Sequence, residues 1–383
     1  MGTAAAGGPL AGVTVLELAG IGPGPFAAML LADLGADVVR VDRPTGGGLA
    51  PAPPEADVLN RGKRSIVLDL KRPEAVEALL TLAGTADVLL EGNRPGVTER
   101  LGLGPDAVWA RNPRVVYARM TGWGQDGPLA ATAGHDVGYI ALTGALHAIG
   151  PAGGPPMIPL NLVGDFGGGS TYLVIGILAA LTEAARTGRG QVVDAAIVDG
   201  ASHLLAAIHA MLGSGRWADE RGVNMLDGGT PYYAVYATAD GGHMAVGALE
   251  PKFYAEFVRL LGVDVDPARQ HDRDHWPAMR TAFAAAFASR TREEWAAVFE
   301  GTDACVAPVL GLREAARHPH IAARGSVLDH GGVLQPGTAP RFSAHPRTAP
   351  AVPPSPGAHT RDVLGAAGVD VEALLGSGAG VQA

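Results

Sequence analysis

The feature that most constrains the fold is the alternation of short β-rich runs with helical stretches over the first third of the chain. Strands and helices that alternate in this way form right-handed β-α-β units, which build a parallel sheet covered by helices. The sequence therefore predicts an α/β domain at its start. The expected strands lie at 13–19, 37–42, 65–70, 87–91, 115–120 and 191–195, and the first helices at 22–34 and 73–82.

A second pattern, which begins near Pro231, predicts a smaller α+β domain. It consists of a hairpin around a glycine-containing turn, with helices after it. The chain before it is helical, and its 167–186 stretch is apolar on nearly all sides, so we expect that helix to be buried. The expected elements are helices at 135–148, 167–186 and up to about 211, hairpin strands at 232–238 and 243–248, helices at 251–261, 276–288 and 292–299, and a late helix near 371. The expected division is 1–215 for the first part of the large domain, 225–325 for the small domain and 330–383 for a Pro-rich C-terminal segment.

Composition excludes several classes of function. The net charge of −9 argues against binding to nucleic acid or to an anionic membrane surface. The single cysteine, Cys305, rules out an internal disulfide, and no histidine pair has a third ligand at metal spacing, so we expect no metal. No Lys or Arg precedes Arg40, and the longest apolar run, 172–181, is half of a membrane span. We therefore expect a cytoplasmic protein with no membrane partner.

The glycine-rich segment 20–24 follows the first strand, where a nucleotide-phosphate loop would lie. Phe26 stands where a dinucleotide-binding fingerprint has its third glycine, and Pro23 and Pro25 remove two backbone donors that a pyrophosphate would need. We therefore expect a tight turn here, and NAD binding is the weaker alternative. A basic cluster at 60–71 holds two of the three lysines. It is either a solvated strand edge or a cationic cradle for the phosphates of a nucleotide-bearing ligand.

Segment 164–170, Gly-Asp-Phe-Gly-Gly-Gly-Ser, is the most informative part of the sequence. Asp165 is a good N-cap for a helix, which is the structural alternative. Three successive glycines are poor helix formers, but they suit a helix start whose N–H groups must approach a ligand closely. A carboxylate beside such donors is an arrangement for proton transfer. The backbone donors predicted to hold an oxyanion are those of Phe166, Gly167 and Gly168.

Eight segments, in this order along the chain, resemble the α-methylacyl-CoA racemase family of the class III CoA-transferase superfamily. The resemblance covers about residues 10–340. It implies a Rossmann-like large domain completed by both chain ends, a smaller α+β domain, and an interlocked homodimer whose active sites are shared between the two chains. The segments are 17–25, 38–44, 119–125, 133–136, 161–169, 224–229, 245–251 and 302–308.

The resemblance also implies roles for individual residues. His135 and Asp165 correspond to two catalytic bases, and Glu250 to the partner of His135. These bases would interconvert (2R)- and (2S)-2-methylacyl-CoA thioesters by moving the α-proton through an enolate, with no cofactor beyond the CoA of the substrate. Arg43 corresponds to a residue that holds the adenine end of CoA. Further implied CoA or substrate contacts are Leu68, Asp69, Leu70, Lys71, Arg100, Gly134, His135, Asp136, Val137, Gly138 and Tyr139.

Two other functions stay open from the sequence. In a CoA-transferase of the same superfamily, Asp165 would attack the thioester and carry the acyl group as a covalent anhydride. Such an enzyme has no need of a second base, so the His135 and Glu250 pair favours the racemase. A non-catalytic protein that binds acyl-CoA or NAD is the third possibility, and the segment around Asp165 argues against it.

Overall fold

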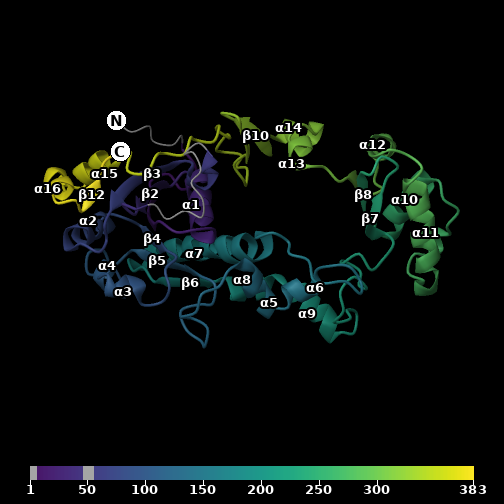
Figure 1. Cartoon of the computed structure of the whole chain (residues 1–383), viewed down its shortest axis with the longest axis horizontal. Coiled ribbons are helices and arrows are strands. Elements are labelled where there is room, and N and C mark those ends of the chain that lie inside the picture. Colours follow the sequence, from purple (N-terminus) through teal and green to yellow (C-terminus); the bar gives the residue numbers. More distant parts are fainter. Residues whose placement is uncertain (1–6, 46–55) are drawn as a thin grey trace. The chain divides into compact units, whose positions relative to one another are not determined.

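The computed structural model describes residues 7–45 and 56–383. The chain divides into a large unit, which comprises residues up to Thr143, Leu160–Leu204 and His318–Ala383, and a small unit of Gly144–Pro159 and Leu205–Arg317 (Figure 1). The prediction placed Gly144–Pro159 with the large domain. This segment belongs to the small unit because Arg221 donates hydrogen bonds to the carbonyls of His147 and Gly154.

The large unit is built on a seven-stranded sheet in the order β12-β3-β2-β1-β4-β5-β6. All the strand pairs are parallel except that of β12 with β3. The order 3-2-1-4-5-6 is that of a Rossmann fold, and the C-terminal end of the chain adds β12 at the edge, as expected. The strands are β1 Thr14–Leu18, β2 Asp37–Asp42, β3 Lys63–Leu68, β4 Val88–Glu91, β5 Val116–Thr121, β6 Val192–Ala196 and β12 Gly380–Val381.

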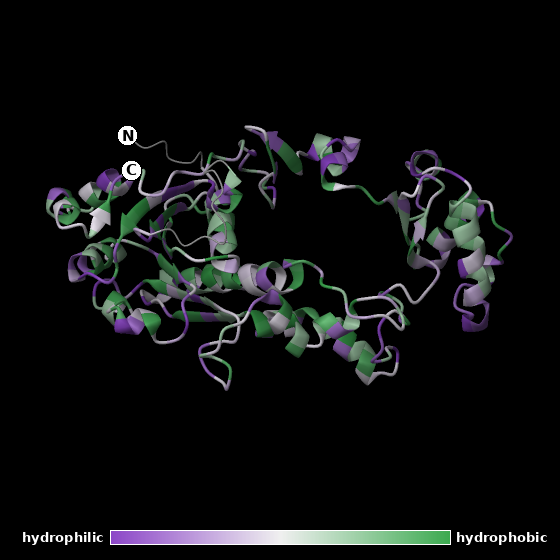
Figure 2. Ribbon diagram, viewed as in Figure 1, coloured by the Kyte–Doolittle hydropathy of each residue, from purple (hydrophilic) through white to green (hydrophobic). Residues whose placement is uncertain are grey.

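Helices cover both faces of this sheet, and each face has its own apolar core. The central strands β4 and β5 are almost continuously buried, as the strands of a two-sided parallel sheet must be. Figure 2 shows the hydropathy of the residues along these elements. A separate hairpin, β10 Val327–His330 with β11 Val333–Pro336, precedes the C-terminal helices. The helices are α1 Pro23–Asp33, α2 Pro73–Ala83, α3 Val97–Arg100, α4 Pro105–Trp109, α5 Asp136–Leu142, α7 Thr171–Thr187, α8 Ile197–Leu204, α14 Pro319–Arg324, α15 Thr360–Ala366 and α16 Val371–Gly376.

The central apolar helix differs from its prediction in two ways. It begins at Leu162 as a π-helix, Leu162–Ser170, and continues as α7, whereas the sequence predicted a start at Gly167. It is also buried on one side only, because Ile177 packs in the core while Ile175 is 60% exposed. Within the described residues, 162–187 is one helix that is long and apolar enough to cross a membrane, but its buried face packs against β5 and β6.

The predicted helix 135–148 is divided between the two units. Its first part forms α5. Gly144, in the left-handed conformation with φ of 84°, separates α5 from α6, Ala145–Ala148. The predicted helix up to about residue 211 is also divided, into α8 of the large unit and α9, Ala206–Gly213, of the small unit.

The small unit is an antiparallel three-stranded sheet, β7-β8-β9, packed against helices. The predicted hairpin and the three helices after it are confirmed to within two residues, whereas the third strand was not predicted. Its core is rich in aromatic rings: Phe257, Phe283 and Phe287 are fully buried, and the ring of Phe257 contacts the other two. The remaining elements are β7 Tyr233–Ala237, β8 His243–Gly247, α10 Pro251–Leu261, α11 Trp276–Phe287, α12 Arg292–Phe299, β9 Val306–Pro308 and α13 Leu312–Ala315.

Candidate active site

The carboxyl edge of the parallel sheet gathers most of the predicted site residues of the large unit. Ligands of such sheets bind at this edge, near the point where the strand order reverses, which here is between β1 and β4. The glycine-rich loop 20–24 follows β1, Arg43 follows β2, and Lys71 lies shortly after β3. The topology therefore brings together segments that lie far apart in the sequence.

Asp165 lies in the first turn of the π-helix, and its surroundings fix it closely. Its backbone N–H donates a 2.7 Å hydrogen bond to Oδ1 of Asp136. Its Oδ2 is 3.5 Å from Nδ2 of Asn161, and a Cβ atom on Gly22 would lie 3.2 Å from the same oxygen. The rings of Phe26 and Phe166 stack at 4.2 Å, and this stack joins the start of α1 to the π-helix. The loop predicted as a simple tight turn is therefore part of the site.

The pKa of Asp165 is raised above its ordinary value. Burial is the main cause, and the negative charge of Asp136 adds to it, whereas Asn161 and His135 act in the opposite direction. A raised pKa makes this carboxyl group a stronger base, and one that is more readily protonated, than an ordinary aspartate.

His135 lies beside Asp165 in the large unit. It is the N-cap residue of α5, it is exposed, and its side chain makes no hydrogen bond or ion pair with the described residues. It directly precedes Asp136, whose Oδ1 accepts the backbone N–H of Asp165, so the fold brings residues 135 and 165 close together. Two of the three predicted catalytic residues are thus near each other within one unit.

Of the predicted thioester segment 134–139, two side chains point into the protein. Asp136 is buried and holds Asp165, with its Oδ2 left without a hydrogen-bond partner among the described residues. Tyr139 is buried edge-on against Trp123, where Cβ atoms at Gly122 and Gly134 would lie within 2.5 Å of its ring. These two side chains therefore support the site, and the outward-facing side chains are those of His135 and Val137.

The predicted oxyanion donors need correction. The backbone N–H of Phe166 already donates to the carbonyl of Asn161, and Gly167 and Gly168 lie inside the π-helix rather than at a free helix start. Their smallness serves packing instead, because a Cβ on Gly168 would lie 2.6 Å from the backbone nitrogen of Ala201 in α8. Beside both bases, the backbone N–H groups of Asp136 and Val137 have no acceptor among the described residues.

Most of the basic cluster is not available to phosphate groups. Lys63 is buried with its Nζ 2.6 Å from Oε2 of Glu17, and burial lowers its pKa. Arg61 is buried against Asp33, and Arg64 pairs with Asp37. Intramolecular carboxylates therefore neutralise these three cations. Leu68 likewise lies in the core, so its side chain is not available to a ligand. Asp69 and Leu70 are half-buried, and Lys71 is exposed.

Three arginines remain available to an anionic ligand at this edge. Arg43 and Arg100 are exposed and make no ion pair with the described residues, and their roles in CoA binding stay predictions. Arg94 was not predicted, although it follows β4; burial raises the pKa of the Tyr139 phenol, and the positive charge of Arg94 acts against that rise. The position of Arg94, three residues after a buried strand of the parallel sheet, could have identified it from the sequence.

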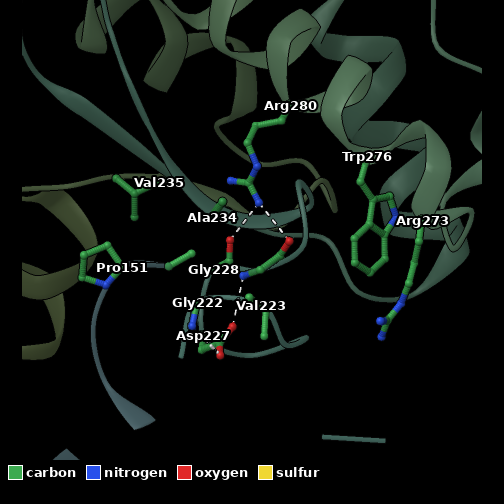
Figure 3. A pocket seen from close by; sticks show the side chains of 12 residues that line it. Pro151, Gly222, Val223, Asp227, Gly228, Ala234, Val235, Arg273, Trp276 and Arg280 are labelled. Atoms are coloured by element: carbon green, nitrogen blue, oxygen red, sulfur yellow. Dashed lines mark hydrogen bonds between the residues drawn. The ribbon is translucent and has the colours of Figure 1, made fainter. Parts of the chain in front are cut away.

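Glu250, the third predicted catalytic residue, belongs to the small unit. It is the N-cap of α10, it is exposed, and its carboxylate makes no hydrogen bond or ion pair with the described residues. The small unit also has a cavity of about 650 Å³ beside Trp276 and Arg280, which sequence reasoning missed (Figure 3). Arg280 donates to the carbonyls of Gly228 and Gly229 at its rim. No group of three or more potential metal ligands is found in residues 7–45 and 56–383.

Comparison with known proteins decides the family. The model of the family described as "CoA-transferase family III" matches residues 10–360. The chain belongs to CoA-transferase family III. It is 47% identical to mouse alpha-methylacyl-CoA racemase, with 96% of this chain and 95% of the mouse protein covered, and 45% identical to the human protein of that name, with 93% and 92% covered. A crystal structure of a CAIB/BAIF family protein from Brucella suis matches with a TM-score of 0.80 at 28% identity, over 94% of this chain and 99% of that one.

Proposed function

We propose that this protein is an isomerase that interconverts (2R)- and (2S)-2-methylacyl-CoA thioesters by two-base proton transfer. The observation that carries the proposal is that His135 directly precedes Asp136, whose carboxylate accepts the N–H of Asp165, so the two bases lie at one place in the fold; burial also raises the pKa of the Asp165 carboxyl group. Two bases on opposite sides of one carbon are what inversion requires, because one removes the proton and the other delivers a new one. The high identity to the mouse and human racemases supports the same activity.

In the proposed mechanism, the thioester acidifies its α-carbon, and His135 or Asp165 takes the proton according to the enantiomer bound. The enolate oxygen needs a hydrogen-bond donor, and the unpaired N–H groups of Asp136 and Val137 lie beside both bases. Arg43, Arg94 and Arg100 supply positive charge for the phosphates of CoA. This chemistry calls for no metal or redox group, because the thioester itself supplies the acidity. We expect the reaction to take place in the cytoplasm.

We further propose that two chains form a homodimer with shared sites. Glu250 belongs to the small unit, whereas its proposed partner His135 lies in the large unit. Apolar side chains that a second copy would cover are exposed on α7, on α8, at the start of the π-helix and on the segment before it. They include Ile158, Leu160, Leu162, Ile175 and Leu204.

The test is incubation of one epimer of a 2-methylacyl-CoA in D2O, with and without a free-acid acceptor. We expect epimerisation with α-deuterium incorporation, which does not depend on the acceptor. A new thioester that forms only with the acceptor would identify a transferase instead, and the absence of both products would contradict any catalytic assignment.

Substitution of the two bases gives the complementary test. Asp165→Ala and His135→Ala should each lower the racemisation rate by a factor of about 10² to 10⁴, the usual contribution of a general acid or base. Acyl-CoA binding, measured by calorimetry, should change little. Full activity in either variant would contradict the assignment of that base.

A further inference from the structure

The short junction that carries Glu250 is held by a single side chain from another loop. Only Ala248, Leu249 and Glu250 separate β8 from α10. The Nε2 of Gln270 donates one hydrogen bond to the carbonyl of Ala248, at 3.1 Å, and another to the carbonyl of Leu249, at 2.9 Å. Both carbonyls immediately before Glu250 are therefore fixed by one amide group.

The Gln270 side chain lies in the interior of the small unit, not on its surface. It is buried, and Nε1 of Trp276 donates to its backbone carbonyl at 2.9 Å. The two acceptors define the orientation of the amide, because the flipped orientation would set Oε1 against two carbonyl oxygens. That Oε1 has no hydrogen-bond partner among the described residues. A buried oxygen without a donor is unfavourable, so an apolar side chain would suit the site better if filling space were the only requirement.

No described side chain of the small unit forms a hydrogen bond or an ion pair with the Glu250 carboxylate. It is exposed and has no side-chain partner among the described residues, so its direction depends on the main chain that carries it. We infer that Gln270 is a positioning residue, which aims the Glu250 carboxylate at its histidine by holding the carbonyls of Ala248 and Leu249. The inference rests on the proposed function for the role of Glu250, but the placement of Glu250 can be measured without any assay of activity.

Cys305 provides that measurement. It is the only cysteine of the chain, and its carbonyl accepts a hydrogen bond from the N–H of Gly247, three residues before Glu250. The pKa of its thiol is raised by burial and then by the negative charges of Glu250 and Asp303. The thiol pKa therefore reports how close the Glu250 charge is.

The experiment uses the full-length protein labelled with [3-13C]cysteine, whose carbon shift is followed against pH by NMR. Glu250→Gln should lower the thiol pKa, because it removes a neighbouring negative charge. Gln270→Met should lower it part of the way, because the released carboxylate moves into solvent. The double variant should titrate like Glu250→Gln alone, since the two changes act through one charge.

Gln382→Met is the matched control. The Nε2 of Gln382 also donates to two backbone carbonyls, those of Ala358 and Ala383, but in the large unit. In the Gln382→Met variant, the Cys305 thiol should titrate with the same pKa as in the wild type. The inference is overturned if Gln270→Met titrates like the wild type, or if its effect is as large in the Glu250→Gln background as alone. Gln270→Asn, which keeps an amide too short to reach both carbonyls, replaces Gln270→Met if the latter does not fold.

The kinetic readout is racemisation. Gln270→Met should lower kcat about tenfold, the scale expected for a misplaced catalytic group, and leave the KM for acyl-CoA unchanged. A raised KM with an unchanged kcat would contradict a positioning role. If the wild type does not racemise, the proposed function fails, while the thiol titration still decides whether Gln270 positions Glu250.

Discussion

At the scale of single residues, the candidate site is shaped by groups that support the two bases. Asp136 is the clearest case. Its Oδ1 accepts the N–H of Asp165, and its charge raises the pKa of the Asp165 carboxyl group. Sequence reasoning placed Asp136 among the substrate contacts, but its side chain is buried, so its effect on the reaction is exerted through Asp165.

Asp136→Asn should therefore shift the acidic limb of the plot of kcat/KM against pH. Asn keeps an oxygen that can accept the N–H of Asp165 but carries no charge, so the pKa of Asp165 should fall. Asp165 would then stay ionised at lower pH, and the acidic limb of kcat/KM should shift downward by about one unit. The measurement is kcat/KM against pH for both proteins. A shift toward higher pH would contradict this electrostatic role.

Gly22→Ala tests the contact between the glycine-rich loop and Asp165. The new Cβ would lie 3.2 Å from Oδ2 at a φ of 70°, so the carboxylate must move, and we expect kcat to fall by roughly 10- to 100-fold. Gly12→Ala is the matched control, because Gly12 also has a positive φ but open space around its Cβ position. Equal losses of kcat in the two variants would indicate backbone strain rather than contact with Asp165.

At the scale of elements, the π-helix and α8 approach each other closely because both present glycine. A Cβ on Gly168 would lie 2.6 Å from the nitrogen of Ala201, and one on Gly200 would lie 1.8 Å from the carbonyl oxygen of Gly168. Burial of one face of α7 against the sheet holds this arrangement in place. The glycine run that suggested an approaching ligand is therefore explained by an approaching helix.

Gly168→Ala should consequently destabilise the fold. We expect the free energy of unfolding, measured with urea, to fall by about 1–3 kcal/mol, the usual cost of overpacking a core. Gly213→Ala, at the end of α9 with open space around its Cβ position, should change it little. Equal stability of the two variants would show that the contact with α8 is not tight in solution.

At the scale of the whole molecule, the three proposed catalytic residues are divided between two units. His135 and Asp165 lie in the large unit and Glu250 in the small one. A site shared between two chains of a homodimer would unite them, because two-fold symmetry gives each site one histidine and one glutamate from different chains.

Subunit complementation tests this arrangement. His135→Ala and Glu250→Ala chains, each inactive alone, are co-expressed and co-purified. If the sites are shared, each mixed dimer contains one intact site, so random pairing should restore about one quarter of the wild-type activity. Activity no higher than that of the separate variants would show that each site uses residues of one chain.

The amino-acid sequence by itself predicted the parallel sheet and the small domain, because the alternation of strands with helices and the turn residues are local patterns, and it predicted the family from eight ordered motifs. It also singled out His135 and Asp165 as the proposed bases, because both stand in such motifs. Only the tertiary structure decided which donors and charges are free: the carboxylate of Glu17 neutralises Lys63, the carbonyl of Asn161 occupies the N–H of Phe166, and Gln270 holds the junction of Glu250. Most of these partners lie far apart along the chain, and no local pattern records a hydrogen bond that depends on how distant elements pack.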